Sequence, residues 1–287
     1  MTTFGVSMFK DEADVAAGVI AHMAGQVDEM IVADNGSTDG TREILDHLAG
    51  AYPLTVIDDP DPAYYQADKM TALADKAHAC GAVWVVLFDA DELWHAPDPY
   101  QRVADVLALS EARVAPALLL NHFRTMLDVD DPDPFRSMVW RSAEAAALPK
   151  VAVRWMPGAR AHQGNHGADL PGHVGPPDVQ LYVRHFPYRT EAQFVRKAVN
   201  GAEAYRLAPD LPTDWGAHWR AYGDLVDRHG EGALRTVFHS HFEHLSPTDA
   251  GLVNDPAPYQ LIKTGGGPYR DSAPWPDDLT AAPEVSS

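Results

Sequence analysis

The first 88 residues alternate short apolar segments with amphipathic ones, and this alternation constrains the fold more than any other feature. Apolar runs bounded by turn-forming residues predict strands, and apolar side chains at helical spacing predict helices. Their regular alternation favours a parallel sheet with helices on both faces. The expected strands are residues 3–9, 29–33, 54–57 and 83–88, and the expected helices are residues 12–25, 41–48 and 66–79.

The pattern weakens after Leu93 and becomes helical again from Glu191. Between them, a Gly-, His- and Pro-rich stretch over residues 157–177 is too long for an ordinary connector, which is typical of functional loops. The tail from Asp255 is rich in Pro, Gly and Asp, and we expect it to wrap the surface or to be disordered. The other expected elements are strands at 115–121, 151–155 and 179–185, and helices at 100–110, 191–207, 215–229 and 232–244.

An excess of acidic side chains limits the partners that this surface attracts. The 287 residues include 41 Asp and Glu against 22 Lys and Arg, a formal net charge of −19. Such a surface repels phosphate backbones and anionic lipid, so nucleic-acid and membrane-surface roles are disfavoured. The single cysteine excludes an internal disulfide and fits a cytoplasmic location. The apolar runs are far shorter than the roughly 20 residues that span a bilayer, so we expect no transmembrane segment.

Three carboxylates, Asp89, Asp91 and Glu92, follow the most apolar of the expected strands. Ligands of open α/β sheets bind beyond the carboxyl ends of the strands. Strand alternation lets Asp89 and Asp91 point the same way, and paired short carboxylates suit a hard cation such as Mg²⁺ or Mn²⁺. A solvated acidic turn is the alternative interpretation.

A second polar segment, Asp34-Asn35-Gly36-Ser37-Thr38-Asp39-Gly40-Thr41, also lies between an expected strand and an expected helix. Its two glycines permit positive φ and close approach of a ligand to the backbone. An ordinary strand-to-helix turn with a good N-cap explains the same residues equally well.

Together with Ser7-Met8-Phe9-Lys10-Asp11-Glu12, these two segments resemble family 2 glycosyltransferases of the GT-A fold, in both order and spacing. The segments Gly164-Asn165-His166, His185-Phe186-Pro187-Tyr188-Arg189 and Gln193-Phe194-Val195-Arg196-Lys197 resemble the C-terminal part of bacterial members. The resemblance covers residues 3–205 and is most specific in the first hundred. It implies an α/β fold with a mostly parallel, Rossmann-like central sheet flanked by helices, followed by a helical C-terminal extension.

The resemblance also implies an organisation of the chain. Residues 1–122 would be the nucleotide-sugar-binding half of the GT-A domain, and residues 123–190 the acceptor-binding half. Residues 191–254 would form the helical extension, and residues 255–287 a surface or disordered tail.

For the donor, the resemblance implies contacts with the base and ribose at the first strand end, and acceptance of a nucleobase N–H by Asp34. Lys69 lies in the helix before the aspartates and either approaches the nucleotide or is solvated. The implied donor-binding residues are Ser7, Phe9, Asp11, Asp34, Gly36, Lys69, Asp89 and Ala90.

A divalent cation, Mn²⁺ or Mg²⁺, would bridge the diphosphate and neutralise charge on the departing nucleoside diphosphate. The implied metal ligands are Asp89, Asp91 and a later histidine. His185 is the first choice because it follows an expected strand, and His162 and His166 are its rivals.

Family 2 members typically invert the anomeric configuration, which requires a base that removes the acceptor proton. The Glu-Asp pair that usually supplies this base is missing after Asp133. His166, Asp169 and Glu191 are the candidate bases in its place.

The resulting hypothesis is a metal-dependent, hexosyltransferase-type glycosyltransferase. It would use a nucleotide-diphosphate sugar, UDP-sugar first, and a small-molecule, lipid-linked or glycan acceptor. One alternative is a sugar-phosphate nucleotidyltransferase, although residues 8–12 lack the glycine-rich basic loop that such enzymes usually carry. Another is a non-catalytic nucleotide-sugar-binding module, which the missing Glu-Asp pair favours.

Two further clusters have simple interpretations. His239, His241 and His244 suggest a metal site, but on a helix only the last two share a face, so we expect a helix surface. A basic cluster contains Arg189, which either clamps a phosphate or pairs with the protein's own carboxylates. Its members are Arg184, Arg189, Arg196 and Lys197.

Overall fold

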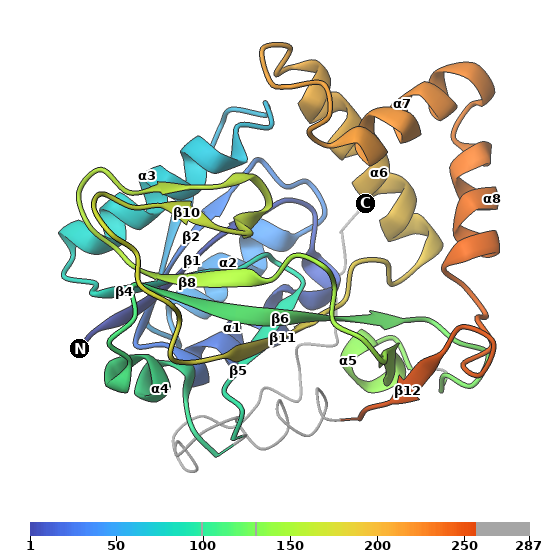
Figure 1. Ribbon diagram of the computed structural model, residues 1–287. Coiled ribbons are helices and arrows are strands. Elements are labelled where there is room, and N and C mark those ends of the chain that lie inside the picture. The colour runs from blue at the N-terminus through green and yellow to red at the C-terminus, as the bar shows by residue number, and fades with distance from the viewer. Residues whose placement is uncertain (99, 130, 257–287) are drawn as a thin grey trace.

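The computed structural model describes residues 1–98, 100–129 and 131–256, which form a mixed α/β fold with a curled central sheet (Figure 1). The strands are β1 (Thr3–Phe9), β2 (Glu29–Asp34), β3 (Leu54–Asp58), β4 (Trp84–Leu87), β5 (Glu92–His95), β6 (Val114–Phe123), β7 (Trp140–Ser142), β8 (Lys150–Arg154), β9 (Arg160–Ala161), β10 (Ala168–Asp169), β11 (Leu181–His185) and β12 (Leu252–Asn254). The helices are α1 (Ala13–Gln26), α2 (Thr41–Ala49), α3 (Gln66–Ala79), α4 (Val103–Leu109), α5 (Pro134–Ser137), α6 (Glu191–Arg206), α7 (Ala217–His229) and α8 (Gly232–His241), with a short 3₁₀ helix η1 (Gln163–Asn165).

The sheet has a parallel half and a mixed half. Its strand order is β12-β7-β6-β8-β4-β1-β2-β3, with β11 beside β6 and β5 beside β11. The four strands expected in the first 88 residues form the parallel half, β4-β1-β2-β3. Strand β8 runs antiparallel to both β4 and β6, so the sheet beyond β4 does not continue the predicted parallel order. The carboxyl ends of β1, β2 and β4 nevertheless meet at one edge, as the sequence predicted.

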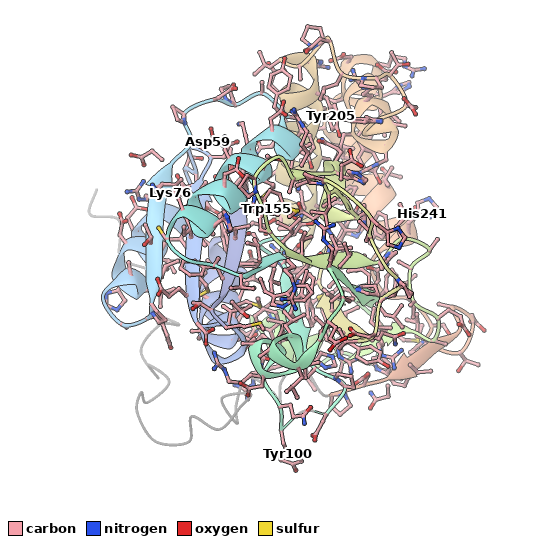
Figure 2. All side chains as sticks on the ribbon, turned by 60° about the vertical axis from the view of Figure 1, so that its left-hand side comes forward. Asp59, Lys76, Tyr100, Trp155, Tyr205 and His241 are labelled. Atoms are coloured by element: carbon pink, nitrogen blue, oxygen red, sulfur yellow. The ribbon has the colours of Figure 1, made fainter. Side chains whose placement is uncertain are left out.

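Two apolar layers cover the two faces of this sheet. One contains α1 and α2, with Val19, Ile20 and Leu45 fully buried against it. The other contains α3, whose Met70 and Ala74 are fully buried against β1 and β4. The indole Nε1 of Trp155 donates to the carboxylate of Asp75 on α3 at 2.8 Å, which ties this helix to the end of β8 (Figure 2).

The helical extension, α6 to α8, has an apolar core of its own. Figure 1 shows these three helices grouped on the side of the molecule opposite the N-terminus. Phe194, Phe238 and Leu234 form the buried centre of the group. Thr190 caps α6 by accepting from the Gln193 backbone N–H at 3.2 Å, and the Gln193 side chain accepts from the Arg189 N–H at 3.1 Å. This reciprocal cap fixes where α6 begins.

Several element boundaries differ from the sequence prediction. Helix α8 ends at His241 rather than residue 244, because Phe242 leaves the helical conformation and His244 has a positive φ of 53°. Helix α4 begins at Val103 rather than residue 100, since Arg102 is extended and its guanidinium binds the carbonyls of Gly25 and Val27. The sequence analysis did not anticipate β5, β7, β9, β10, β12 or α5, each of which has five residues or fewer.

Residues 257–287, most of the predicted tail, lie outside the described part of the chain. Within the described ranges, the helices are all too short or too polar to cross a lipid bilayer. The cytoplasmic location expected from the single cysteine stays a prediction.

Replacing Phe194 by alanine tests the core of the helical extension. The ring is fully buried against Tyr222, Phe238 and Phe242. Its loss should lower the free energy of unfolding by about 3–5 kcal/mol, measured by urea denaturation. The control, Leu109→Ala, removes a side chain that is 86% exposed and should change stability by about 0.5 kcal/mol or less. Equal stability of the two variants would show that this core contributes little.

Candidate active site

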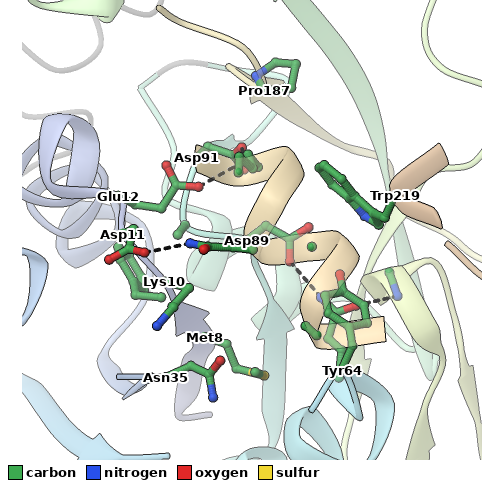
Figure 3. Close-up of a pocket in the computed structure, with 18 of the residues that line it drawn as sticks. Met8, Lys10, Asp11, Glu12, Asn35, Tyr64, Asp89, Asp91, Pro187 and Trp219 are labelled. Carbon is green, nitrogen blue, oxygen red and sulfur yellow. Dashed lines mark hydrogen bonds and ion pairs between the residues drawn. The ribbon is translucent and has the colours of Figure 1, made fainter. Parts of the chain in front are cut away.

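A pocket with a volume of about 510 Å³ lies at the edge where β1, β2 and β4 end. Three segments reach it: residues 8–12 at the end of β1, Asn35 after β2, and residues 89–91 after β4. The opposite wall comes from α6 and α7, and Figure 3 shows Asp11 and Glu12 facing Trp219 across the cavity. The pocket therefore joins the parallel half of the sheet to the helical extension.

The turn after β2 is held against the loop after β1 by a set of hydrogen bonds. The Asp11 carboxylate accepts from the Thr38 N–H at 2.7 Å, and the Asp11 N–H donates to Ser37 Oγ at 3.0 Å. Gly40 has a φ of 97°, a left-handed conformation that favours glycine, just before α2 begins. These contacts give residues 35–40 a fixed shape at the pocket edge.

Asp34 supports the same turn rather than lining the pocket. Its Oδ2 accepts from the Ser37 N–H at 3.1 Å, while Oδ1 is buried and has no hydrogen-bond partner among the described residues. Asn35, one residue further, lines the pocket, and its Nδ2 donates to the Asp59 carboxylate at 2.8 Å. Asn35 is therefore better placed than Asp34 to make the polar contact with a ligand that was expected of Asp34.

Asp89 is held by buried polar side chains. One of its oxygens pairs with Lys150 of β8, and the other accepts from the Asn165 and Gln66 amides at 2.8 and 3.3 Å. Lys150 also lies 3.0 Å from the fully buried Glu92 carboxylate and donates to the Gly164 carbonyl at 2.8 Å. Burial raises the pKa of Glu92, and Lys150 opposes that shift. Lys150 is therefore a structural counterion for two carboxylates.

Asp91 has a different set of partners. Lys197 of α6 lies 2.5 Å from its Oδ2 and also 2.9 Å from the Glu12 carboxylate. Burial favours the neutral form of Asp91, but Lys197, His185 and Arg189 outweigh it and lower its pKa well below the usual value. The carboxylate is thus held ionised at the pocket wall.

Strand alternation does not set the orientation of the Asp89 and Asp91 side chains. Strand β4 ends at Leu87, and the Glu92 N–H donates to the Asp89 carbonyl at 3.2 Å, which closes a turn. The sequence analysis treated Asp89 and Asp91 as neighbours on one strand face. The turn instead gives each carboxylate its own lysine.

His185 and Asp91 together have the chemistry of a cation site. His185 Nδ1 lies 2.7 Å from Asn121 Oδ1. Because an amide oxygen can only accept, Nδ1 is the donor, and the neutral ring carries its lone pair on Nε2. That Nε2 lies 3.5 Å from Asp91 Oδ1: a protonated ring pairs with the carboxylate and lowers its pKa, whereas a neutral ring leaves two facing acceptors that fit a bound cation. The described residues contain no cluster of three or more His, Cys, Asp and Glu side chains suited to a metal.

The three candidate bases lie in different places. His166 lines the pocket, and its Nδ1 donates to the Pro149 carbonyl at 3.0 Å, so Nε2 carries the lone pair. Burial and then Lys150 lower the pKa of His166, which keeps the ring neutral at pH 7. Asp169 pairs with His162 in the β9–β10 hairpin, and its side chain is 80% exposed. Glu191 pairs with Arg235 at the start of α6 and does not line the pocket.

Some of the other predicted donor-binding residues line the pocket and some lie outside it. Phe9, Asp11, Asp89 and Ala90 line the pocket, whereas Ser7 and Gly36 do not. Ser7 is fully buried within β1. Lys69 is turned away to Asp59, with Nζ 2.7 Å from its carboxylate.

Two histidines of the cluster, His239 and His244, and Arg189 lie within ion-pair distance of carboxylates. His239 bridges Glu191 and Glu243, and these carboxylates raise its pKa. Arg189 is 1% exposed and pairs with Glu12 and Asp14, so it is a counterion rather than a phosphate clamp.

Sequence reasoning missed several pocket residues. Lys150 gave no local signal, because a lone lysine before an expected strand resembles a solvated side chain. Lys197 was noted as part of a basic cluster, but its distance from Asp91 in the sequence hid the pairing. Met8, Lys10, Glu12 and Asn35 stood in the predicted motifs, and the pocket residues that were not anticipated are Tyr64, Gln66, Asn200 and Trp219.

Comparisons with known proteins bear on the class of this fold and pocket. Residues 6–115 match the family model described as glycosyl transferase family 2. No curated protein sequence matches the chain.

Solved structures give weaker likenesses. Residues 1–349 of TarS from S. aureus, in complex with UDP-GlcNAc, are 13% identical, with 93% of this chain and 82% of that chain covered and a TM-score of 0.37. Glucosyl-3-phosphoglycerate synthase from Mycobacterium tuberculosis is 21% identical, with 41% and 44% covered and a TM-score of 0.29. GalNAc-T7 with UDP, GalNAc and Mn²⁺ is 13% identical, with 84% and 58% covered and a TM-score of 0.34. At such TM-scores these likenesses assign no substrate and no residue role to this chain.

The fold is a mixed α/β fold with a curled central sheet, consistent with the GT-A fold that the sequence predicted. Over residues 6–115 the chain carries a glycosyl transferase family 2 segment, so the resemblance is confirmed there. The predicted enzyme class, glycosyltransferase, is confirmed by the same match.

Replacing Lys150 by methionine should destabilise the protein in a pH-dependent way. Burial raises the pKa of Glu92, so its ionisation lowers the free energy of unfolding as the pH rises through its folded pKa. Lys150 limits that loss of stability. Without Lys150 the buried Glu92 and the partly exposed Asp89 lack their counterion, so we expect a loss of about 3–5 kcal/mol at pH 8 and less near pH 5, from urea denaturation. The control is the exposed Lys76→Met. A loss that does not vary with pH would contradict the counterion role.

Proposed function

We propose that the protein is a metal-dependent, inverting glycosyltransferase that uses a nucleotide-diphosphate sugar, with UDP-sugar as the first expectation. The observation that carries this proposal is the facing pair of Asp91 Oδ1 and His185 Nε2, 3.5 Å apart on the pocket wall. The pair lies at the strand-end edge where ligands of α/β sheets bind.

The nucleoside would lie between the ends of β1 and β2. Met8 and Phe9 give this part of the pocket an apolar side, and Lys10 and Asn35 give it a polar one. Asn35 uses its Nδ2 on Asp59 and on the Asp61 carbonyl at 2.6 Å, which leaves its amide oxygen as an acceptor. An acceptor at this position suits the imide N–H of uracil.

Asp91 and His185 would hold Mn²⁺ or Mg²⁺, which supplies positive charge for the diphosphate leaving group when it is bound. Asp89 remains fixed by Lys150 and two amides, so it orders the motif rather than ligating the metal. Asn121 keeps His185 in the tautomer that presents its lone pair to the site.

The transfer itself is an in-line displacement. The acceptor hydroxyl oxygen bonds to the anomeric carbon as the bond to the β-phosphate oxygen breaks, and that oxygen keeps the electron pair. His166 takes the hydroxyl proton on Nε2, because its Nδ1–H is committed to the Pro149 carbonyl. The low pKa of His166 leaves it ready to accept that proton at neutral pH.

The acceptor would enter from the side of the helical extension. Trp219 of α7 lines this wall, with its ring packed on Gly201 of α6, and Tyr64 and Tyr188 add further aromatic surface. Aromatic faces with polar neighbours suit small molecules, glycans and the sugar part of lipid-linked acceptors equally. The identity of the acceptor is therefore a matter for screening.

Replacing Asp91 by asparagine tests the donor and metal site. Uridine, guanosine, thymidine, cytidine and adenosine diphosphates would be compared by thermal shift, with and without Mn²⁺. A ligand at 100 times its Kd adds about 2.7 kcal/mol, several degrees for a chain of this size. We expect one nucleotide to give a metal-dependent shift that Asp91→Asn abolishes. The exposed Asp224→Asn of α7 should retain it, and a shift that survives in Asp91→Asn would rule out this metal site.

Replacing His166 by glutamine tests the base. The rate of sugar transfer should fall by about 10²–10⁴-fold while nucleotide binding stays unchanged. Wild-type activity should decline only as the pH falls through the lowered pKa of His166, and the variant should lose that dependence. His162→Gln, in the exposed hairpin pair, should keep both rate and pH profile. Full activity of His166→Gln would assign the base elsewhere.

A further inference from the structure

Helix α6 faces the acidic edge of the sheet with a row of polar side chains. Arg196 donates to the Asp11 carbonyl at 3.0 Å, and Asn200 donates to the Asp11 carboxylate at 2.7 Å. Lys197 reaches further, to Glu12 and Asp91. The helical extension is therefore fastened to the pocket through the same carboxylates that line it.

A diphosphate needs positive charge in this pocket, because Asp11, Glu12, Asp89 and Asp91 line it and repel an anion. The lysines and arginines that line it are Lys10, Lys150, Arg196 and Lys197.

Three of these four cations are committed elsewhere. The Lys150 side chain is 4% exposed and serves two carboxylates. Lys10 donates to the Gly36 carbonyl at the turn after β2, and Arg196 pairs with Asp39 at 3.3 Å. Lys197 alone of the four touches Asp91, and its side chain is 25% exposed.

The two oxygens of Asp91 have different neighbours. Oδ1 faces His185 Nε2, and Oδ2 is paired with Lys197 Nζ at 2.5 Å. A divalent cation at the first oxygen and an ammonium at the second compete for one carboxylate charge, since each weakens the other's attraction. An incoming diphosphate would relieve this competition by giving the ammonium another anion.

We propose that Lys197 is a diphosphate-binding residue that exchanges anions: it neutralises Asp91 in the free protein and moves to the diphosphate when the donor binds. The flexible stem of lysine carries a compact ammonium with three donors, so Nζ can keep Glu12 at 2.9 Å while it leaves Asp91. The proposal rests on the function proposed above, because it assumes a nucleoside diphosphate in this pocket.

Two binding measurements on Lys197→Met test the exchange in opposite directions. The first is UDP binding by calorimetry at saturating Mn²⁺, where we expect affinity to fall roughly tenfold or more, as for loss of a charged hydrogen bond. The second is Mn²⁺ binding without nucleotide, followed by electron paramagnetic resonance. Here the affinity should rise several-fold, because the competitor for Asp91 is gone.

Matched variants keep the result interpretable. Lys197→Gln retains polar contacts with Glu12 and Asp91 and should show the same two changes if Lys197→Met folds poorly. Arg206→Met removes a cation from the same helix outside the pocket, where it pairs with Asp227, and should change neither affinity.

Three outcomes would overturn the proposal. Unchanged UDP affinity in Lys197→Met and Lys197→Gln would show that Lys197 does not contact the diphosphate. Weaker binding of both UDP and Mn²⁺ would make Lys197 a purely structural residue. Failure of the wild-type protein to bind any nucleoside diphosphate would sink the proposed function itself, and the inference with it.

Discussion

The ion pairs between α6 and the acidic edge of the sheet are the interaction on which the rest of this structure depends. A carboxylate buried without a counterion is costly, and Glu12 and Asp91 lie in just such positions. Arg189 and Lys197, both brought by the segment that leads into or forms α6, supply the missing charge. The pocket exists because this segment must return to β1 and β4, and the same return places Trp219 opposite the strand ends.

Strand β8 plays the corresponding part on the other side of the site. It enters the sheet antiparallel between β4 and β6, and its first residue, Lys150, meets Asp89 and Glu92. The reversal that interrupts the parallel order is thus what delivers the counterion. The position of β8 therefore has two consequences: it makes this half of the sheet mixed, and it orders the turn that contains Asp89 and Glu92.

The sequence predicted the parts of the fold that local patterns determine. The first four strands and α1 to α3 follow from apolar periodicity, and the pocket edge follows from polar residues at the ends of β1, β2 and β4. What could not be predicted depends on contacts between distant residues. Lys150 is 61 residues from Asp89 and Lys197 is 106 from Asp91, and no local pattern marks either lysine as a partner. Short strands such as β5 and β7 exist only through pairing with β11, β6 and β12.

The two aspartates of the motif show how far such distant contacts decide chemistry. Asp89, whose own side chain is 30% exposed, meets a lysine whose side chain is 4% exposed and two amides, so its charge is compensated by the protein itself. Asp91, two residues on, meets a lysine whose side chain is 25% exposed and a histidine whose lone pair faces it. Two aspartates only two residues apart in the sequence therefore differ in their capacity to bind a ligand. In the exchange proposed above, a carboxylate whose counterion is partly exposed gives it up to a substrate anion and binds a metal ion, and one whose counterion is buried keeps it.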